Sequence, residues 1–280
     1  MPLRKGQTLE IEYSSGAETL IKWSASDGAE TWFDAEFSLN KSLIIKKTSN
    51  DKIAIKLLDL LNAARNLNPA FLVVPGTYSA KNQLDFNRDW GWGSSSTLIS
   101  NVAWWAEIDP FELNSLISEG SGYDIACARS ETPLFYRLTI GNPEIESIRF
   151  NPGFSDHLVF IYLGSKQDTP VEINRFIPDQ AHLNTQIKEV SAISEQMAAS
   201  VSLEHFNNLI DRHESIMGNI LKRQPVKELL FPDFDGSVKS LGAWGGDFIM
   251  ASSANDYMKT KRYFDERGYT VAFSWNEIIR

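Results

Sequence analysis

The sequence has almost no cysteine: Cys127 is the only one in 280 residues. A single cysteine cannot form an internal disulfide or a multi-thiolate zinc site. The four histidines are scattered and form no recognisable pair with it. We therefore expect Cys127 to be a packed structural thiol rather than a nucleophile.

Long apolar runs and an excess of basic residues are also missing. No uncharged apolar stretch approaches about 18 residues, the length of a membrane span, and the charged start at residues 1–5 is not followed by the apolar core of a signal peptide. The chain has 27 basic and 36 acidic residues, a net charge of −9, and no long basic run, whereas nucleic acid needs a concentrated positive field. We expect a cytoplasmic enzyme or binding protein without a membrane or nucleic-acid partner. Local phosphate binding through backbone N–H groups and a metal ion stays open.

The length suits one large domain or two domains of about 140 residues. The strongest candidate for a boundary is Gly141-Asn142-Pro143, because glycine and proline together interrupt regular structure. The sequence therefore predicts an N-terminal domain over residues 1–141 and a C-terminal domain over residues 142–280.

Hydrophobic periodicity predicts a mixture of strands and helices. Alternation predicts strands in the first fifty residues, and a period near 3.6 predicts a helix at 52–66 with Asp51 as its N-cap. Further along, the patterns predict strands at 71–74, 78–86, 134–140, near Ile148, at 157–163 and at 270–275, a hairpin at 238–252, and helices at 95–106, 111–118, 183–197, 203–221 and 255–267. The whole reads as an α+β protein.

Three loops carry residues suited to chemistry. Trp90–Thr97 has two glycines and three serines before a predicted helix, which favours an anion site at the helix start, although a plain helix cap explains it too. Ser121–Ala126 contains Asp124, a turn former unless it faces that anion site. Lys239–Asp247 is rich in small residues, which suits either a closely packed hairpin or a ligand.

In this order the three loops resemble the motifs of the GHMP kinases (galactokinase, homoserine kinase, mevalonate kinase, phosphomevalonate kinase). Residues 91–96, Gly-Trp-Gly-Ser-Ser-Ser, resemble the family's central Gly-Leu-Gly-Ser-Ser-Ala phosphate loop. Residues 242–246, Gly-Ala-Trp-Gly-Gly, resemble its C-terminal glycine loop, and residues 121–124 resemble the Ser-Gly-x-Asp of mevalonate kinases. Residues 122–126, Gly-Tyr-Asp-Ile-Ala, resemble a subgroup named for that string. The resemblance spans nearly the whole chain.

The resemblance implies a two-domain α+β fold, with an N-terminal domain like ribosomal protein S5 and a C-terminal ferredoxin-like sandwich. It also implies transfer of a phosphoryl group from ATP, with Mg²⁺, to a small hydroxyl or phosphate acceptor, mevalonate-type acceptors being favoured weakly. Asp124 matches the catalytic residue that deprotonates or orients the acceptor, and Ser95 the serine that reaches Mg²⁺. The implied nucleotide-binding residues are Gly91, Gly93, Ser94, Ser95 and Ser96. The implied substrate-binding residues are Ser121, Gly122, Gly242, Ala243, Gly245 and Gly246.

The sequence departs from the family pattern at several positions. The first motif of the family, whose lysine pairs with the aspartate in mevalonate kinases, has no counterpart, and residues 1–7 resemble the stretch that follows it. Either the start lies upstream of Met1 or the chain has lost this edge; without it, Asp124 lacks an ammonium partner and is less stabilised as an anion. Trp92, Trp244 and Asp247 stand where small residues are usual. A metal-binding glutamate is implied, with Glu112 and Glu119 both in range.

Three alternatives to an active kinase stay open. One is a non-catalytic protein of this fold that binds a nucleotide or a partner, and another is a diphosphomevalonate-decarboxylase-like enzyme. The third is an unrelated α+β protein, in which Asp124 would lie far from residues 94–96.

Overall fold

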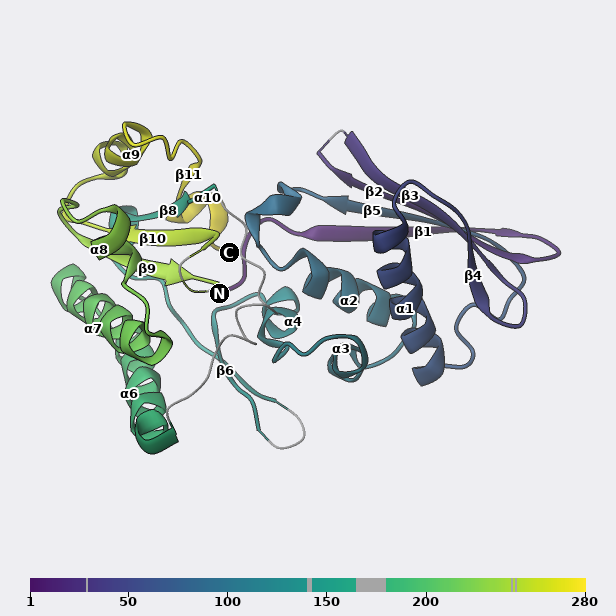
Figure 1. Cartoon of the computed structure of the whole chain (residues 1–280), viewed down its shortest axis with the longest axis horizontal. Helices are drawn as coiled ribbons and strands as arrows, with labels where there is room; N and C mark the ends of the chain where they lie inside the picture. Colours follow the sequence, from purple (N-terminus) through teal and green to yellow (C-terminus); the bar gives the residue numbers. More distant parts are fainter. Residues whose placement is uncertain (29, 140–142, 165–179, 243, 245) are drawn as a thin grey trace. The chain divides into compact units, whose positions relative to one another are not determined.

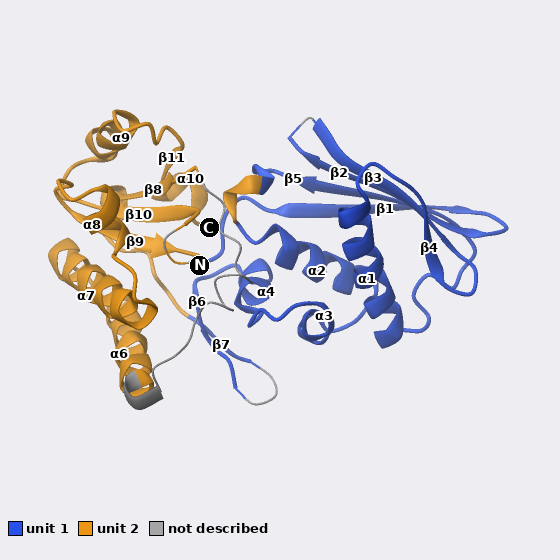
Figure 2. Ribbon diagram, viewed as in Figure 1, with its two compact units in different colours: residues 1–88, 92–147 blue, residues 89–91, 148–280 orange. Residues whose placement is uncertain are grey.

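The computed structural model (Figure 1) describes residues 1–28, 30–139, 143–164, 180–242, 244 and 246–280. The chain divides into two compact units (Figure 2): residues 1–88 with 92–147, and residues 89–91 with 148–280. The boundary predicted between residues 141 and 142 lies outside the described residues. None of the helices described is long and apolar enough to cross a membrane.

The first unit contains a five-stranded sheet in the order β1-β5-β2-β3-β4. Its strands are β1 (Gln7–Ser15), β2 (Thr19–Asp27), β3 (Glu30–Leu39), β4 (Leu43–Thr48) and β5 (Gly76–Leu84). β5 is antiparallel to β1 and parallel to β2, and the other pairs are antiparallel. Every second residue of the central strands is buried, as in Ile21 and Trp23 of β2 and Phe33 and Phe37 of β3, so one face of the sheet is apolar.

Helices α1 (Asp51–Leu67) and α2 (Ser94–Trp105) lie on the sheet (Figure 1), and α3 (Pro110–Ile117) and α4 (Tyr123–Ala128) pack against these helices. α1 packs against β4, and α2 packs against β1, α3 and α4. Leu61 of α1, Val102 of α2 and Ile125 of α4 are fully buried in the same core. This packing fixes the start of α2 beside the start of α4.

Several local predictions in this unit are wrong. Asn50, not Asp51, caps α1, since its side chain accepts the N–H of Ile53. Residues 71–74 form turns instead of a strand: Leu72 has φ +63°, and the side chains of Val73 and Val74 are more than half exposed. The strand predicted near Ile148 ends at Ser147 as β7 (Glu144–Ser147), which pairs with β6 (Leu134–Arg137) in a separate two-stranded sheet.

The second unit contains a four-stranded antiparallel sheet in the order β11-β8-β10-β9. The strands are β8 (Leu158–Tyr162), β9 (Ser237–Leu241), β10 (Phe248–Ser252) and β11 (Ala272–Ser274). The helices are α6 (Gln180–Ala198), α7 (Leu203–Leu221), α8 (Val226–Leu230), α9 (Tyr257–Asp265) and α10 (Trp275–Ile278). Two short 3₁₀ turns are η1 (Arg88–Trp90) and η2 (Ser155–His157). α7 and α8 pack on β9, and α9 on β8. The sequence of strands and helices is that of a ferredoxin-like sandwich. The predicted α+β class with two units is confirmed.

Candidate functional site

The start of α2 is an exposed set of backbone donors. Gly93 precedes the helix in the left-handed conformation, with φ +72°, and no side chain caps the helix. The first intrahelical bond runs from the Thr97 N–H to the Gly93 carbonyl, at 3.0 Å, so the N–H groups of residues 94–96 precede the helical ladder. A helix start of this kind carries a partial positive charge and favours an anion.

Side chains around this start leave its outer surface open. Ser95 is exposed, and Ser94 and Ser96 are half-buried. Thr97 turns inward, where its hydroxyl contacts the side chain of Gln7 and lies 3.1 Å from the Ser94 carbonyl. The first turn is therefore fixed from the sheet side, while the serine hydroxyls stay available to a ligand.

Asp124 lies in the first turn of α4, not in a loop as the sequence suggested. Gly122 caps this helix with φ +84°, and a Cβ there would lie 3.2 Å from the Phe111 ring and 3.5 Å from the Tyr136 hydroxyl. Any larger residue at Gly122 would need both strain and displacement of a ring. The glycine thus sets the position of α4 and of Asp124 on it.

The structure brings Asp124 and Gly93 together. A Cβ built on Gly93 would lie 3.5 Å from Asp124 Cγ and 3.6 Å from its Oδ2. The carboxyl group therefore contacts the cap of α2, within the first unit. This is the arrangement that the GHMP resemblance implied, and it contradicts the alternative in which Asp124 lies far from residues 94–96.

Burial raises the pKa of the Asp124 carboxyl, and the Tyr123 hydrogen bond and the α-amino group of Met1 act in the opposite direction. The increase shows that loss of hydration outweighs the groups that stabilise the anion. A carboxyl with a raised pKa is a better proton acceptor once ionised.

A pocket of about 390 Å³ lies beside α4. Ser121, Tyr123 and Cys127 line it together with Tyr136, whose hydroxyl donates to the Ser121 carbonyl; Met1, Leu134 and Leu138 complete the lining. Cys127 is only half-buried and lines this pocket. The pocket is bordered by Tyr123 and Cys127 of the helix that carries Asp124, but Asp124 itself does not line it.

The two glutamates implied as metal ligands are exposed. Glu112 lies in the first turn of α3, and Glu119 follows that helix. Among the described residues, no group of three or more His, Cys, Asp or Glu side chains could hold a metal ion. The residues present fit an ion that is carried mainly by phosphate oxygens, with a serine hydroxyl as one ligand.

The third loop belongs to the second unit. Gly242 is exposed with φ +65°, and Gly246 is buried; Ala243 and Gly245 lie outside the described residues. Gly91 also belongs to the second unit and contacts Asp247 at the end of this loop. Asp247 stood out in the sequence as a departure from the family pattern, and the structure gives it a defined place.

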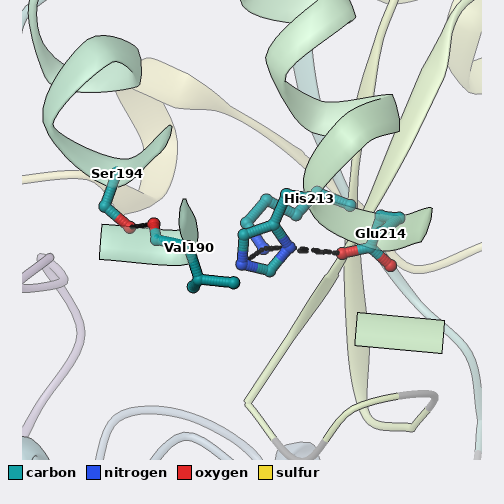
Figure 3. Close-up of polar contacts among 5 residues, drawn as sticks. Val190, Ser194, His213 and Glu214 are labelled. Atoms are coloured by element: carbon teal, nitrogen blue, oxygen red, sulfur yellow. Dashed lines mark hydrogen bonds and ion pairs between the residues drawn. The ribbon is translucent and has the colours of Figure 1, made fainter. Parts of the chain in front are cut away.

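A buried polar cluster lies between α7 and β9 in the second unit (Figure 3). Sequence reasoning missed it. His213 and Glu214 of α7 meet Lys239 of β9: Nδ1 of His213 is 3.3 Å from Glu214 Oε1, and the Lys239 Nζ is 3.2 Å from the same Nδ1 and 3.5 Å from the same Oε1. The signal in the sequence is weak, because Lys239 stands between Val238 and Ser240 in a strand that also contains Ser237.

Opposing effects set the ionisation of this cluster. Burial opposes the charge on Glu214, but the hydrogen bond to His213, the charge of Lys239 and hydrogen bonding from Ser240 together outweigh it and lower the Glu214 pKa. Burial lowers the pKa of Lys239, although Glu214 acts against this. The cluster is therefore a buried ion network in which the Glu214 carboxylate is stabilised by its neighbours, while burial still outweighs Glu214 at the Lys239 ammonium.

Comparison with known proteins identifies the fold. No protein-family model matches the sequence, and no curated protein matches it. Solved structures do match: mevalonate kinase from L. major in complex with R-mevalonate (TM-score 0.63, 13% identity, covering 97% of this chain and 86% of that one), and phosphomevalonate kinase from Streptococcus pneumoniae in complex with phosphomevalonate and AMPPNP (TM-score 0.67, 13% identity, 96% and 90%). Galactokinase from Lactococcus lactis with galactose matches with TM-score 0.65 and 11% identity over 97% and 85%. The chain has the fold of the GHMP kinases.

Proposed function

We propose that this chain is an ATP-dependent small-molecule kinase. It transfers the γ-phosphoryl group of ATP, with Mg²⁺, to a hydroxyl or phosphate of a small acceptor. The observation that carries the proposal is the contact between the Asp124 carboxyl and the glycine cap of α2, which puts a candidate base beside a candidate phosphate site.

The start of α2 would hold the nucleotide. The N–H groups of residues 94–96 and the partial charge of the helix suit the phosphates, and the hydrogen at Gly93 in place of a side chain lets them approach the backbone. Ser95, exposed at this start, is the proposed ligand to Mg²⁺. Bound Mg²⁺ would neutralise charge on the transferring phosphoryl group.

Asp124 would accept the proton of the acceptor hydroxyl. The acceptor oxygen forms a bond to the γ-phosphorus, the bond from that phosphorus to the bridging oxygen breaks to leave ADP, and the acceptor proton passes to the carboxylate. A carboxyl whose pKa is raised by burial suits this transfer better than a fully hydrated one. The pocket on α4 is the proposed place for the body of the acceptor.

The solved relatives support this proposal without fixing the acceptor. They include enzymes crystallised with R-mevalonate, phosphomevalonate and galactose, and one holds the ATP analogue AMPPNP. The Ser-Gly-Tyr-Asp string at residues 121–124 favours a mevalonate-type acceptor.

A second candidate is a non-catalytic nucleotide-binding protein of this fold. One observation favours it: among the described residues, no lysine or arginine side chain contributes to the pKa of Asp124. The cationic group that does act on Asp124 is the α-amino group of Met1, and a base without a lysine or arginine partner is less strongly held as the anion. Both candidates require ATP at α2, and only the kinase forms phosphorylated product.

Calorimetric titration with MgATP tests the shared step. We expect saturable binding to the wild-type chain, at least about tenfold weaker binding to Ser95→Ala combined with Gly93→Val, and unchanged binding to the control Ser191→Ala, whose hydroxyl is bonded to the Ile187 carbonyl in α6. Thermal unfolding shows whether each variant is folded. If the folded double variant binds MgATP as tightly as the wild type, the nucleotide does not bind at the start of α2.

A further inference from the structure

Helix α4, which carries Asp124, is too short to hold its own position. It has six residues, fewer than two turns, and a helix of this length depends on its contacts with the rest of the fold. Its first turn meets the start of α2, where a Cβ built on Gly93 would lie 3.5 Å from Asp124 Cγ. The contact at the other end of α4 therefore decides how firmly Asp124 is held there.

Arg129 makes that second contact. It follows α4 as its C-cap residue. Its Nε donates to the Ser100 hydroxyl of α2 at 3.0 Å, and its Nη2 donates to the Ser100 carbonyl at 3.4 Å. Arg129 is exposed as a whole residue, but Ser100 is only 7% exposed, so the guanidinium bonds to a buried position of the neighbouring helix. Two donors of one planar group fix a direction as well as a distance.

The two contacts lie at corresponding ends of the two helices. Asp124 and Arg129 are five residues apart, about 7.5 Å along a helix axis, and Gly93 and Ser100 are seven residues apart, about 10.5 Å. The long arginine side chain covers the difference. The short helix therefore runs alongside α2, start beside start, and is held at both ends.

The start of α2 has attachments that do not involve α4. The Asn101 side chain donates to the Gln7 carbonyl at 3.0 Å, and the Thr97 hydroxyl contacts the Gln7 side chain. Both contacts join α2 to the beginning of β1. Loss of the bond between Arg129 and Ser100 should therefore loosen α4 and leave the start of α2 in place.

We propose, on the basis of the proposed function, that Arg129 is a positioning residue: its bonds to Ser100 hold α4 against α2 and keep the Asp124 carboxyl beside the start of α2. Arg129 acts through Asp124 and takes no part in binding the nucleotide. A displacement of about 1 Å caused by a change far from the reacting atoms can cost about 100-fold in rate. Turnover should therefore depend on a hydrogen bond remote from the proton transfer.

The hydration of Asp124 gives a second readout that needs no turnover. Burial is the main cause of the raised pKa of Asp124, and the other groups that act on it are Tyr123 and the α-amino group of Met1. If α4 moves away from α2, the carboxyl gains water and its pKa falls towards its ordinary value. Loss of a positive charge that acted directly on Asp124 would instead raise the pKa, so the direction separates the two roles.

The test compares Arg129→Gln, Arg129→Lys and Ser100→Ala with the wild type. Steady-state kinetics use MgATP with whichever of mevalonate, phosphomevalonate and galactose the wild type phosphorylates fastest. A carboxyl ¹³C NMR titration follows Asp124, with its signal assigned through Asp124→Asn. The matched control is Arg137→Gln, which removes an arginine of the same unit whose exposed guanidinium lies 3.5 Å from Glu144. Thermal unfolding shows which variants are folded.

We expect Arg129→Gln to lower kcat at least about tenfold, with the KM for MgATP changed by less than about threefold, and to lower the pKa of Asp124. Ser100→Ala should act in the same direction but less strongly, because the Ser100 carbonyl remains. Arg129→Lys should recover part of kcat, since one ammonium can replace part of the fork. The control should change neither readout.

Unchanged kcat in folded Arg129→Gln, or an unchanged or raised pKa of Asp124, would overturn the inference alone. So would a higher KM for MgATP at unchanged kcat, because Arg129 would then belong to the nucleotide site. A wild-type chain that neither binds MgATP nor transfers phosphate would overturn the proposed function. The titration would then still decide whether Arg129 holds Asp124 in place.

Discussion

Folding removes two carboxyl groups largely from water, Asp124 in the first unit and Glu214 in the second, and the groups that surround them differ. Asp124 contacts a glycine cap and gains one tyrosine hydrogen bond, and burial raises its pKa. Glu214, 3% exposed, has a histidine and a lysine within 3.5 Å, and these lower its pKa.

The difference separates two uses of a buried acid. A carboxyl compensated by buried partners holds elements together, here α7 and β9. A carboxyl that is left under-compensated beside a helix start costs stability and gains reactivity, as is typical of functional sites. The raised pKa of Asp124 and the lowered pKa of Glu214 are the measurable signs of these roles.

The largest expected effect comes from breaking the compensated cluster. Glu214→Gln leaves the Lys239 ammonium buried without its counter-charge, and loss of one partner of a buried pair costs about 3–5 kcal/mol of unfolding free energy. Urea denaturation at pH 7 measures this loss. The control Glu189→Gln breaks the more exposed contact with Arg212, and should cost at most about 1 kcal/mol.

A double variant sharpens the result. Glu214→Leu with Lys239→Met removes both charges, so it should be less destabilised than Lys239→Met alone. If the double variant loses the sum of both single losses, the three side chains do not form a compensated network.

Asp124→Asn should change the stability of the fold in the opposite direction, towards higher stability at pH 7. Because the folded pKa of Asp124 is raised, its contribution to stability is present below the unfolded pKa, about 3.9, and is lost as the pH rises through the folded pKa. The amide has no such loss, so the variant should unfold at a higher temperature at pH 7, by about 2–4 °C for each kcal/mol recovered. Because the pKa of Glu214 is lowered, Glu214→Gln should instead lower the unfolding temperature at pH 7.

The Asp124→Asn shift should shrink as the pH falls through the raised folded pKa towards the unfolded value of about 3.9, and the Glu214→Gln shift should shrink as the pH falls from about 4.3 through the lowered folded pKa. Thermal unfolding over pH 3–7 follows both variants in one experiment. A lower melting temperature for Asp124→Asn at pH 7 would mean that the ionised carboxylate stabilises the fold, against the comparison drawn here.

The smallest expected effect concerns Tyr123. Its hydrogen bond lowers the pKa of Asp124, so Tyr123→Phe should raise that pKa; the loss of a single hydrogen bond is worth about 1 kcal/mol. Carboxyl ¹³C NMR titration, with the signal assigned through Asp124→Asn, measures it. Tyr78→Phe, whose hydroxyl is bonded to the Val74 carbonyl, should leave the Asp124 titration unchanged.

Local patterns predicted much of the fold. The apolar periods of α1 and α2 each depend on residues of a single helix, so they can be read from the sequence. Gly93 and Gly122 mark the starts of α2 and α4, where each adopts positive φ. The strand predicted at 71–74 failed for a related reason: four apolar residues suit a strand, but Pro75 and the turn from Asn68 leave only Phe71 and Leu72 buried.

Contacts between distant segments were out of reach of such patterns. Nothing local couples Lys239 to α7, or Gly91 to Asp247, since each depends on how strands and helices pack. The proximity of Asp124 to Gly93 was expected only through the family resemblance. The sequence marked Asp247 as a departure from the family pattern and Asp124 as a candidate base, but it gave no indication of the cluster around Lys239.

The most direct test of the account is ADP formation from MgATP with a panel of acceptors: mevalonate, phosphomevalonate and galactose. We predict acceptor-dependent ADP release by the wild-type chain, reduced by at least about 100-fold in Asp124→Asn and kept in Glu189→Gln, with the variants shown to be folded and to bind MgATP. A folded Asp124→Asn variant that transfers phosphate at the wild-type rate would contradict the role of Asp124.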